Sequence, residues 1–206
     1  MTLNTRVADD QLGQYYRKTA AIADRLGKSL DFGSVMDALQ RIHDGKFEKK
    51  EVVKSILSLV NDKVASGAIG SFDPHAFYKD RAGLWIGDFF RNNVLSKASA
   101  VKNLPAAALT SSDLAKNAYD REIIPCLPAG YEWDISEALA RIAQMIEKQP
   151  GGKDGELLNN GYANLFYVPG FVVRVLWRAG PREWFVSAWW LDDNYWRAGR
   201  RVFVRN

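Results

Sequence analysis

The chain has 206 residues, of which 47% are hydrophobic and 25% are charged, a composition typical of a globular protein and not of a disordered or fibrous one. Its net charge of +4 is too small to favour an extensive phosphate-binding surface. Apolar runs stay far below the roughly 18 residues that a membrane span requires, so we expect no membrane association.

Helical patterns dominate the first part of the chain. Apolar residues at three- and four-residue spacing predict helices over residues 9–26, 34–43 and 48–65. Glycines and an Asp-Pro step over residues 67–74 indicate a loop, and the large apolar residues over 83–95 favour a further helix.

Two more helices are expected before residue 150. A connector of small residues over 105–110 is followed by Ser112 or Asp113, either of which caps a short helix that ends before Pro125. Asp134, with Glu137 three residues later, forms an N-terminal capping pattern and begins a helix that ends before Pro150.

Beyond Pro150 the apolar period changes from that of a helix to that of a strand. Residues 163–168, 171–178, 183–191 and 201–205 are rich in aromatic and β-branched side chains and are joined by short turns. The sequence therefore predicts an α+β protein. A multi-helix body over residues 1–150 precedes an antiparallel β-meander of about four strands over residues 151–206, and the two parts pack as one compact protein.

Tryptophan and arginine concentrate in this C-terminal segment. Five of the seven tryptophans lie between Trp177 and Trp196, and seven of the eight basic residues beyond residue 150 are arginines. Both faces of the strand over 183–191 are apolar, which is most often explained by burial of the sheet on both sides. The alternative is that one face stays exposed as a platform for a ligand.

The platform hypothesis designates five binding residues. Arg174 and Arg178 share one face of their strand, beside the rings of the next. Tryptophan and arginine are enriched at protein interfaces, and they also stack on the bases of single-stranded nucleic acid or, for tryptophan, on carbohydrate. We favour a protein partner because the net charge is small. The expected binding residues are Arg174, Arg178, Trp189, Trp196 and Arg197.

The leading hypothesis is a non-catalytic binding or regulatory protein that presents this surface to a macromolecular partner. No glycine-rich phosphate loop, nucleophile elbow or metal-ligand spacing occurs in the sequence, so we expect neither cofactor nor metal. One alternative is a small metal-dependent hydrolase or nuclease that uses His75 with Asp73 or Asp80. Another is a structural homo-oligomer in which the doubly apolar strand forms the subunit interface.

The single cysteine, Cys126, lies between two prolines, and we interpret it as a small buried side chain and not as a nucleophile. One cysteine cannot form an internal disulfide. Together with the absence of an apolar leader pattern at the start of the sequence, this predicts a cytoplasmic location.

Overall fold

A computed structural model describes residues 56–192 and 194–205, which belong to one compact unit of residues 50–206. The helices predicted over 9–26 and 34–43 lie outside the described residues.

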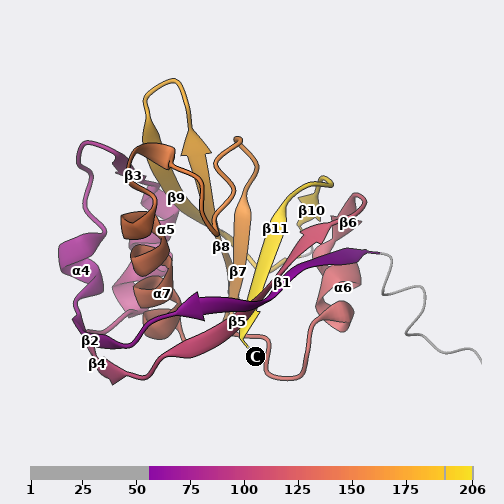
Figure 1. The fold of residues 1–206 in the computed structure, drawn as a ribbon, viewed down its shortest axis with the longest axis horizontal. Helices are drawn as coiled ribbons and strands as arrows, with labels where there is room; N and C mark the ends of the chain where they lie inside the picture. The colour runs from indigo at the N-terminus through magenta and orange to yellow at the C-terminus, as the bar shows by residue number, and fades with distance from the viewer. Residues whose placement is uncertain (1–55, 193, 206) are drawn as a thin grey trace, which may run out of the picture. The chain divides into compact units, whose positions relative to one another are not determined.

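A mixed seven-stranded sheet forms the centre of this unit, in the order β1-β5-β11-β7-β8-β9-β3 (Figure 1). Its strands are β1 (Leu57–Ser66), β3 (Leu84–Ile86), β5 (Ala107–Leu114), β7 (Asn164–Val168), β8 (Phe171–Arg178), β9 (Glu183–Trp190) and β11 (Arg201–Arg205). Two short ribbons accompany it: β2 (Ile69–Phe72) pairs with β4 (Val101–Leu104), and β6 (Ala118–Tyr119) pairs with β10 (Tyr195–Trp196).

The predicted multi-helix N-terminal body is wrong in the part of the chain that the structure describes. Residues 57–66, expected to complete a helix, form β1, and most of the expected connector and the start of the next helix form β5. Because valine and leucine suit both helices and strands, the outcome depends on the partner. β1 pairs antiparallel with β5, a distant segment that local periodicity does not reveal.

Apart from α7 (Ile135–Lys148), the helices in the described part of the chain are short. Residues 83–95 divide into β3, α5 (Asp88–Asn93) and the start of the 3-10 helix η1 (Leu95–Lys97). The other helical segments are α4 (Pro74–Phe77), α6 (Asp120–Ile123), η2 (Ile124–Cys126) and η3 (Pro150–Gly152).

The helix predicted from Asp134 is confirmed as α7, and the Asp134 side chain accepts a hydrogen bond from the Glu137 backbone at 3.0 Å. This bond satisfies one of the amides that a helix leaves unpaired at its beginning.

The predicted four-stranded meander is also wrong, although its four segments are strands. β7, β8 and β9 pair antiparallel in sequence order, but β11 does not follow β9. β11 instead lies between β5 and β7, antiparallel to the first and parallel to the second. The strand therefore crosses to the middle of the sheet, which turn lengths alone do not reveal.

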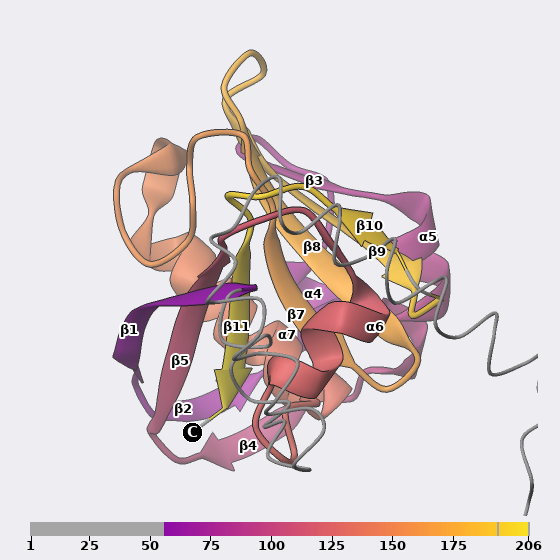
Figure 2. The ribbon, with the colours of Figure 1, turned by 90° about the vertical axis from the view of Figure 1, so that its right-hand side faces the viewer.

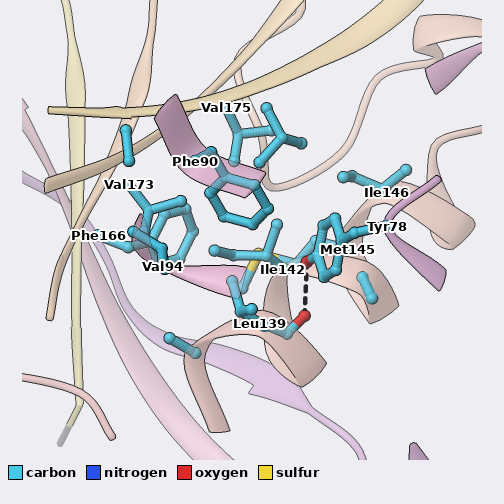
Figure 3. Packing of buried hydrophobic residues seen from close by; sticks show 14 of the residues in the cluster. Tyr78, Phe90, Val94, Leu139, Ile142, Met145, Ile146, Phe166, Val173 and Val175 are labelled. Atoms are coloured by element: carbon cyan, nitrogen blue, oxygen red, sulfur yellow. Dashed lines mark hydrogen bonds between the residues drawn. The ribbon is translucent and has the colours of Figure 1, made fainter. Parts of the chain in front are cut away.

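The two faces of the sheet have different covers (Figures 1 and 2). Helices α5 and α7 pack on one face, where Phe90, Leu139 and Ile142 meet Val173 and Val175 in the larger core cluster (Figure 3). The opposite face is covered over β7 and β11 by α6 and the β6–β10 ribbon, which bury a second cluster.

Candidate tryptophan–arginine site

Alternation along β8 and β9 determines which side chains lie opposite the α7 face. Val173, Val175 and Trp177 belong to the core cluster under α7. The residues that alternate with them along β8, including Arg174 and Arg178, therefore point to the other face. In the register of β8 and β9, Val172 lies opposite Trp189 and Leu176 opposite Phe185. We call this surface the Trp/Arg face: Trp85, Arg174, Arg178, Phe185 and Trp189.

The Trp/Arg face is partly exposed because the cover over β7 and β11 does not extend across it. Trp85 retains 38% and Trp189 42% of their accessible surface, whereas the other three side chains are partly buried. Exposed tryptophan is unusual in a well-packed sheet, since a fully buried indole contributes more to stability.

A stacked pair of tryptophans lies at one end of this face. Trp189 and Trp196 lie 5.2 Å apart at an interplanar angle of 16°. The guanidinium carbon of Arg174 lies 4.1 Å from the ring centre of Trp189 and 5.8 Å from that of Trp196, so this cation contacts both rings. Such contacts contribute about 0.5–2 kcal/mol each, depending on burial.

Trp196 is buried, at 1% exposure, and is fixed from beneath by Asp120. The Asp120 carboxylate, itself buried, accepts hydrogen bonds from the indole of Trp196 at 2.6 Å and the hydroxyl of Tyr167 at 2.9 Å. It also accepts two from Asn194, at 2.7 and 2.8 Å. Four donors satisfy the buried charge and hold β10 against the sheet, which positions the ring under Trp189.

A further arginine, Arg200, reaches the same stack from the segment after β10, and Arg197 follows Trp196 directly in the chain. The guanidinium carbon of Arg200 lies 5.8 Å from the Trp196 ring centre, and its Nη1 donates to the Arg197 carbonyl at 3.0 Å. Arg197 is exposed. We call these five residues the cationic cluster: Arg174, Trp189, Trp196, Arg197 and Arg200.

The charges of this cluster repel one another. Burial lowers the pKa of Arg174 to about 10, and the positive charge of Arg200 contributes to the shift. Burial also lowers the pKa of Arg200, with Arg197 as the second cause. Arg174 and Arg200 are thus held in an environment that disfavours their own charge, and both remain protonated at neutral pH.

Arg178 lies at the other end of β8 in a separate group. Its guanidinium pairs with Glu183 and lies 4.7 Å from the Trp85 ring centre and 4.8 Å from that of Phe185. The structure therefore brings three of the predicted residues into contact, namely Arg174, Trp189 and Trp196. Arg197 follows Trp196 in the chain, and Arg178 lies elsewhere. The charge of Arg178 is already compensated by the Glu183 carboxylate.

Sequence reasoning missed Arg200 and Asp120 near the stack, and Trp85 and Phe185 beside Arg178. Alternation placed Phe185 on the same face as Trp189, so the sequence pattern could have identified Phe185. The pattern could not identify Trp85, because Trp85 reaches this face through the parallel pairing of β3 with β9. Asp120 was expected within a short helix, and nothing local connects it to Trp196.

The residues of the hydrolase alternative have structural contacts. Asp73 caps α4 by accepting from the His75 backbone at 2.9 Å. Asp80 accepts from the Ile86 backbone and pairs with Arg91, both at 2.8 Å. The His75 Nε2 lies 3.1 Å from the Ala98 carbonyl oxygen. These contacts account for both carboxylates without a catalytic role.

Cys126 is partly buried, and its Sγ donates to the Glu122 carbonyl at 3.1 Å. Burial raises the pKa of this thiol, which opposes formation of a nucleophilic thiolate.

Residues 56–192 and 194–205 contain no group of three or more histidine, cysteine, aspartate or glutamate side chains arranged to hold a metal ion. Across the same residues, every helix is too short or too polar to cross a membrane. Comparison of the chain with protein-family models, with characterised proteins and with solved structures finds no match.

Proposed function

We propose that this is a non-catalytic binding or regulatory protein whose Trp/Arg face and adjoining cationic cluster bind a protein partner. The observation that carries the proposal is the half-exposed Trp189, stacked on a buried tryptophan and contacted by a partly buried arginine. A rigid aromatic anchor beside a planar cation is the combination that dominates binding energy at protein interfaces.

A protein partner is favoured over single-stranded nucleic acid by the distribution of charge. Nucleic-acid binding requires a track of basic side chains along the backbone of the ligand. Here Arg178, Arg201 and Arg205 each pair with a carboxylate. Apart from the exposed Arg182 in the β8–β9 turn, the unmatched arginine charge of this region is therefore concentrated around one stack. A single charged point suits one polar group of a protein better than a run of phosphates.

We also propose a cytoplasmic setting for this interaction. The chain contains one cysteine and therefore cannot form an internal disulfide, which accords with a reducing compartment.

The test compares two adjacent tryptophans on opposite faces of β9. Trp189 and Trp190 are 42% and 54% exposed, so each can be truncated to alanine with a similar loss of surface. The full chain and both variants would be used to capture proteins from an extract of the cells that naturally express this protein. Binding of the purified captured protein would then be measured by calorimetry.

We expect Trp189→Ala to weaken binding of the purified partner at least about tenfold, as for an interface anchor, and Trp190→Ala to leave it within about twofold. Equal affinity of the wild type and the Trp189→Ala variant for every captured protein would refute the proposal.

A further inference from the structure

The arginines around the Trp189–Trp196 stack differ from the other arginines of the sheet in having no acidic partner. Arg178, Arg201 and Arg205 pair with Glu183, Asp113 and Glu137. Within the described ranges 56–192 and 194–205, no carboxylate forms an ion pair with Arg174, Arg197 or Arg200.

Arg174 and Arg200 also have unused hydrogen-bonding capacity. The Nε atoms of Arg174 and Arg200 are buried and have no hydrogen-bond partner in the described part of the chain. The Nε of Arg178 is in the same condition, but the charge of that guanidinium is compensated by Glu183. A guanidinium that is desolvated, repelled by its neighbours and unsatisfied at one donor is destabilising unless an anion compensates it. Binding sites retain such groups because the bound ligand supplies the missing charge.

From this arrangement we infer that the cationic cluster is a carboxylate receptor, which recognises an aspartate or glutamate side chain of an acidic segment in the protein partner. The inference rests on the proposed function and specifies the chemistry of the partner. Arg174 and Arg200 bind the carboxylate, Arg197 adds charge at the exposed rim, and Trp189 packs against the adjoining apolar part of the segment.

A carboxylate fits this site better than a polynucleotide because the uncompensated positive charge is confined to one place. The binding groups surround one pair of rings, and Arg178 at the far end of β8 is neutralised by Glu183. A strand of phosphates passing over the Trp/Arg face would therefore meet the cationic cluster, then a compensated arginine, and only in the β8–β9 turn the exposed Arg182.

The test uses a defined probe, the blocked peptide Asp-Glu-Phe-Asp-Glu, and its uncharged counterpart Asn-Gln-Phe-Asn-Gln. Binding to the full chain is followed by NMR through the Nε–H resonances of Arg174 and Arg200 and the indole resonance of Trp189. Oligothymidylate of similar length serves as the nucleic-acid arm. The variants are Arg174→Gln, Arg200→Gln and, as the matched control on the same strand, Arg178→Gln.

We expect saturable shifts of the Arg174 and Arg200 resonances with the acidic peptide, weakened by high salt, and no saturation with the amide peptide. Arg174→Gln and Arg200→Gln should each weaken binding about tenfold, whereas Arg178→Gln should change it less than about twofold. The melting temperature of Arg174→Gln should stay within a few degrees of the wild type, because removal of a partly buried, uncompensated charge offsets the loss of the two ring contacts.

Several outcomes would overturn the inference. Equal binding of both peptides, tighter binding of oligothymidylate, or a lowered melting temperature of Arg174→Gln that Arg174→Lys restores would each assign these arginines another role. Loss of the purified partner in Trp189→Ala but not in Arg174→Gln or Arg200→Gln would leave the proposed function intact and refute only the carboxylate receptor.

Discussion

At the scale of single residues, the packing around Trp177 depends on an unusually close approach of backbone to ring. Gly152 has a φ of +73°, and a Cβ added there would lie 2.2 Å from Cε2 of Trp177. The ring is buried and meets Trp184 edge to face at 5.4 Å, and the indole of Trp184 donates to the Gln149 carbonyl at 3.2 Å. The turn after α7 is thus fitted to the two tryptophans.

Substitution of Gly152 by alanine should be strongly destabilising, and the neighbouring glycine is the matched control. Gly151 also has a positive φ of +66°, but a Cβ there would meet nothing within 4 Å. Gly151→Ala should cost about 1–2 kcal/mol from backbone strain alone. Gly152→Ala should cost at least about 2 kcal/mol more, because Trp177 must move.

The measurement is the free energy of unfolding from urea denaturation monitored by tryptophan fluorescence. Equal destabilisation by the two substitutions would show that Trp177 is not tightly packed against this turn.

At the scale of secondary-structure elements, a buried arginine joins α7 to two short breaks in a long antiparallel pair, in which β1 continues into β2 and β4 into β5. Arg141 is 1% exposed and donates through Nη1 to the Ser66 hydroxyl at 3.0 Å and the Gly67 carbonyl at 2.8 Å. Its Nη2 donates to the Pro105 carbonyl at 2.6 Å and pairs with Glu137 at 3.4 Å. One side chain therefore connects the helix to the link between β1 and β2 and to the segment that enters β5.

We expect Arg141→Met to lower the free energy of unfolding by about 3 kcal/mol, because the two carbonyls and the Glu137 carboxylate lose a buried donor. Amide hydrogen exchange should accelerate at residues 66–69 and 106–107. Arg91→Met is the control, since Arg91 pairs with Asp80 and Asp88 at a partly exposed position. Its effect should stay below about 1 kcal/mol. A stability of Arg141→Met equal to that of the wild type would contradict this role.

At the scale of the whole folded unit, the last strand holds the sheet together. β11 separates β5 and β1 from β7, β8, β9 and β3, and it is paired on both sides. Phe203 is fully buried and stacks on Phe166 of β7, with ring centres 4.9 Å apart at 3°. Removing this strand would divide the sheet and expose both core clusters.

A chain shortened to residues 1–200 should therefore lack a cooperative thermal transition. The loss of a central strand exceeds the roughly 5–15 kcal/mol by which domains are stable. Removal of residue 206 alone is the control and should leave the melting temperature within a few degrees of the full chain. A sharp calorimetric transition in the shortened chain would show that the two parts of the sheet associate without β11.

Local pattern in the sequence was sufficient for several elements. α7 has a side-chain cap at Asp134 and one apolar face, and β7, β8, β9 and β11 are dense in residues that favour strands. Alternation also placed Arg174 and Arg178 on the face opposite Val173 and Val175, because the side-chain period of a strand is independent of its partners.

Only the tertiary structure determined the rest. β1 and β5 are strands because they pair with each other across the chain, and β11 lies beside β7 because both of its edges find partners there. The site follows the same rule. Trp196 reaches Trp189 because Asp120 holds β10 on the sheet, whereas Arg178 lies at the other end of β8, over Trp85 and Phe185. Pairing between distant segments is a property of the folded chain, so no local sequence pattern predicts it.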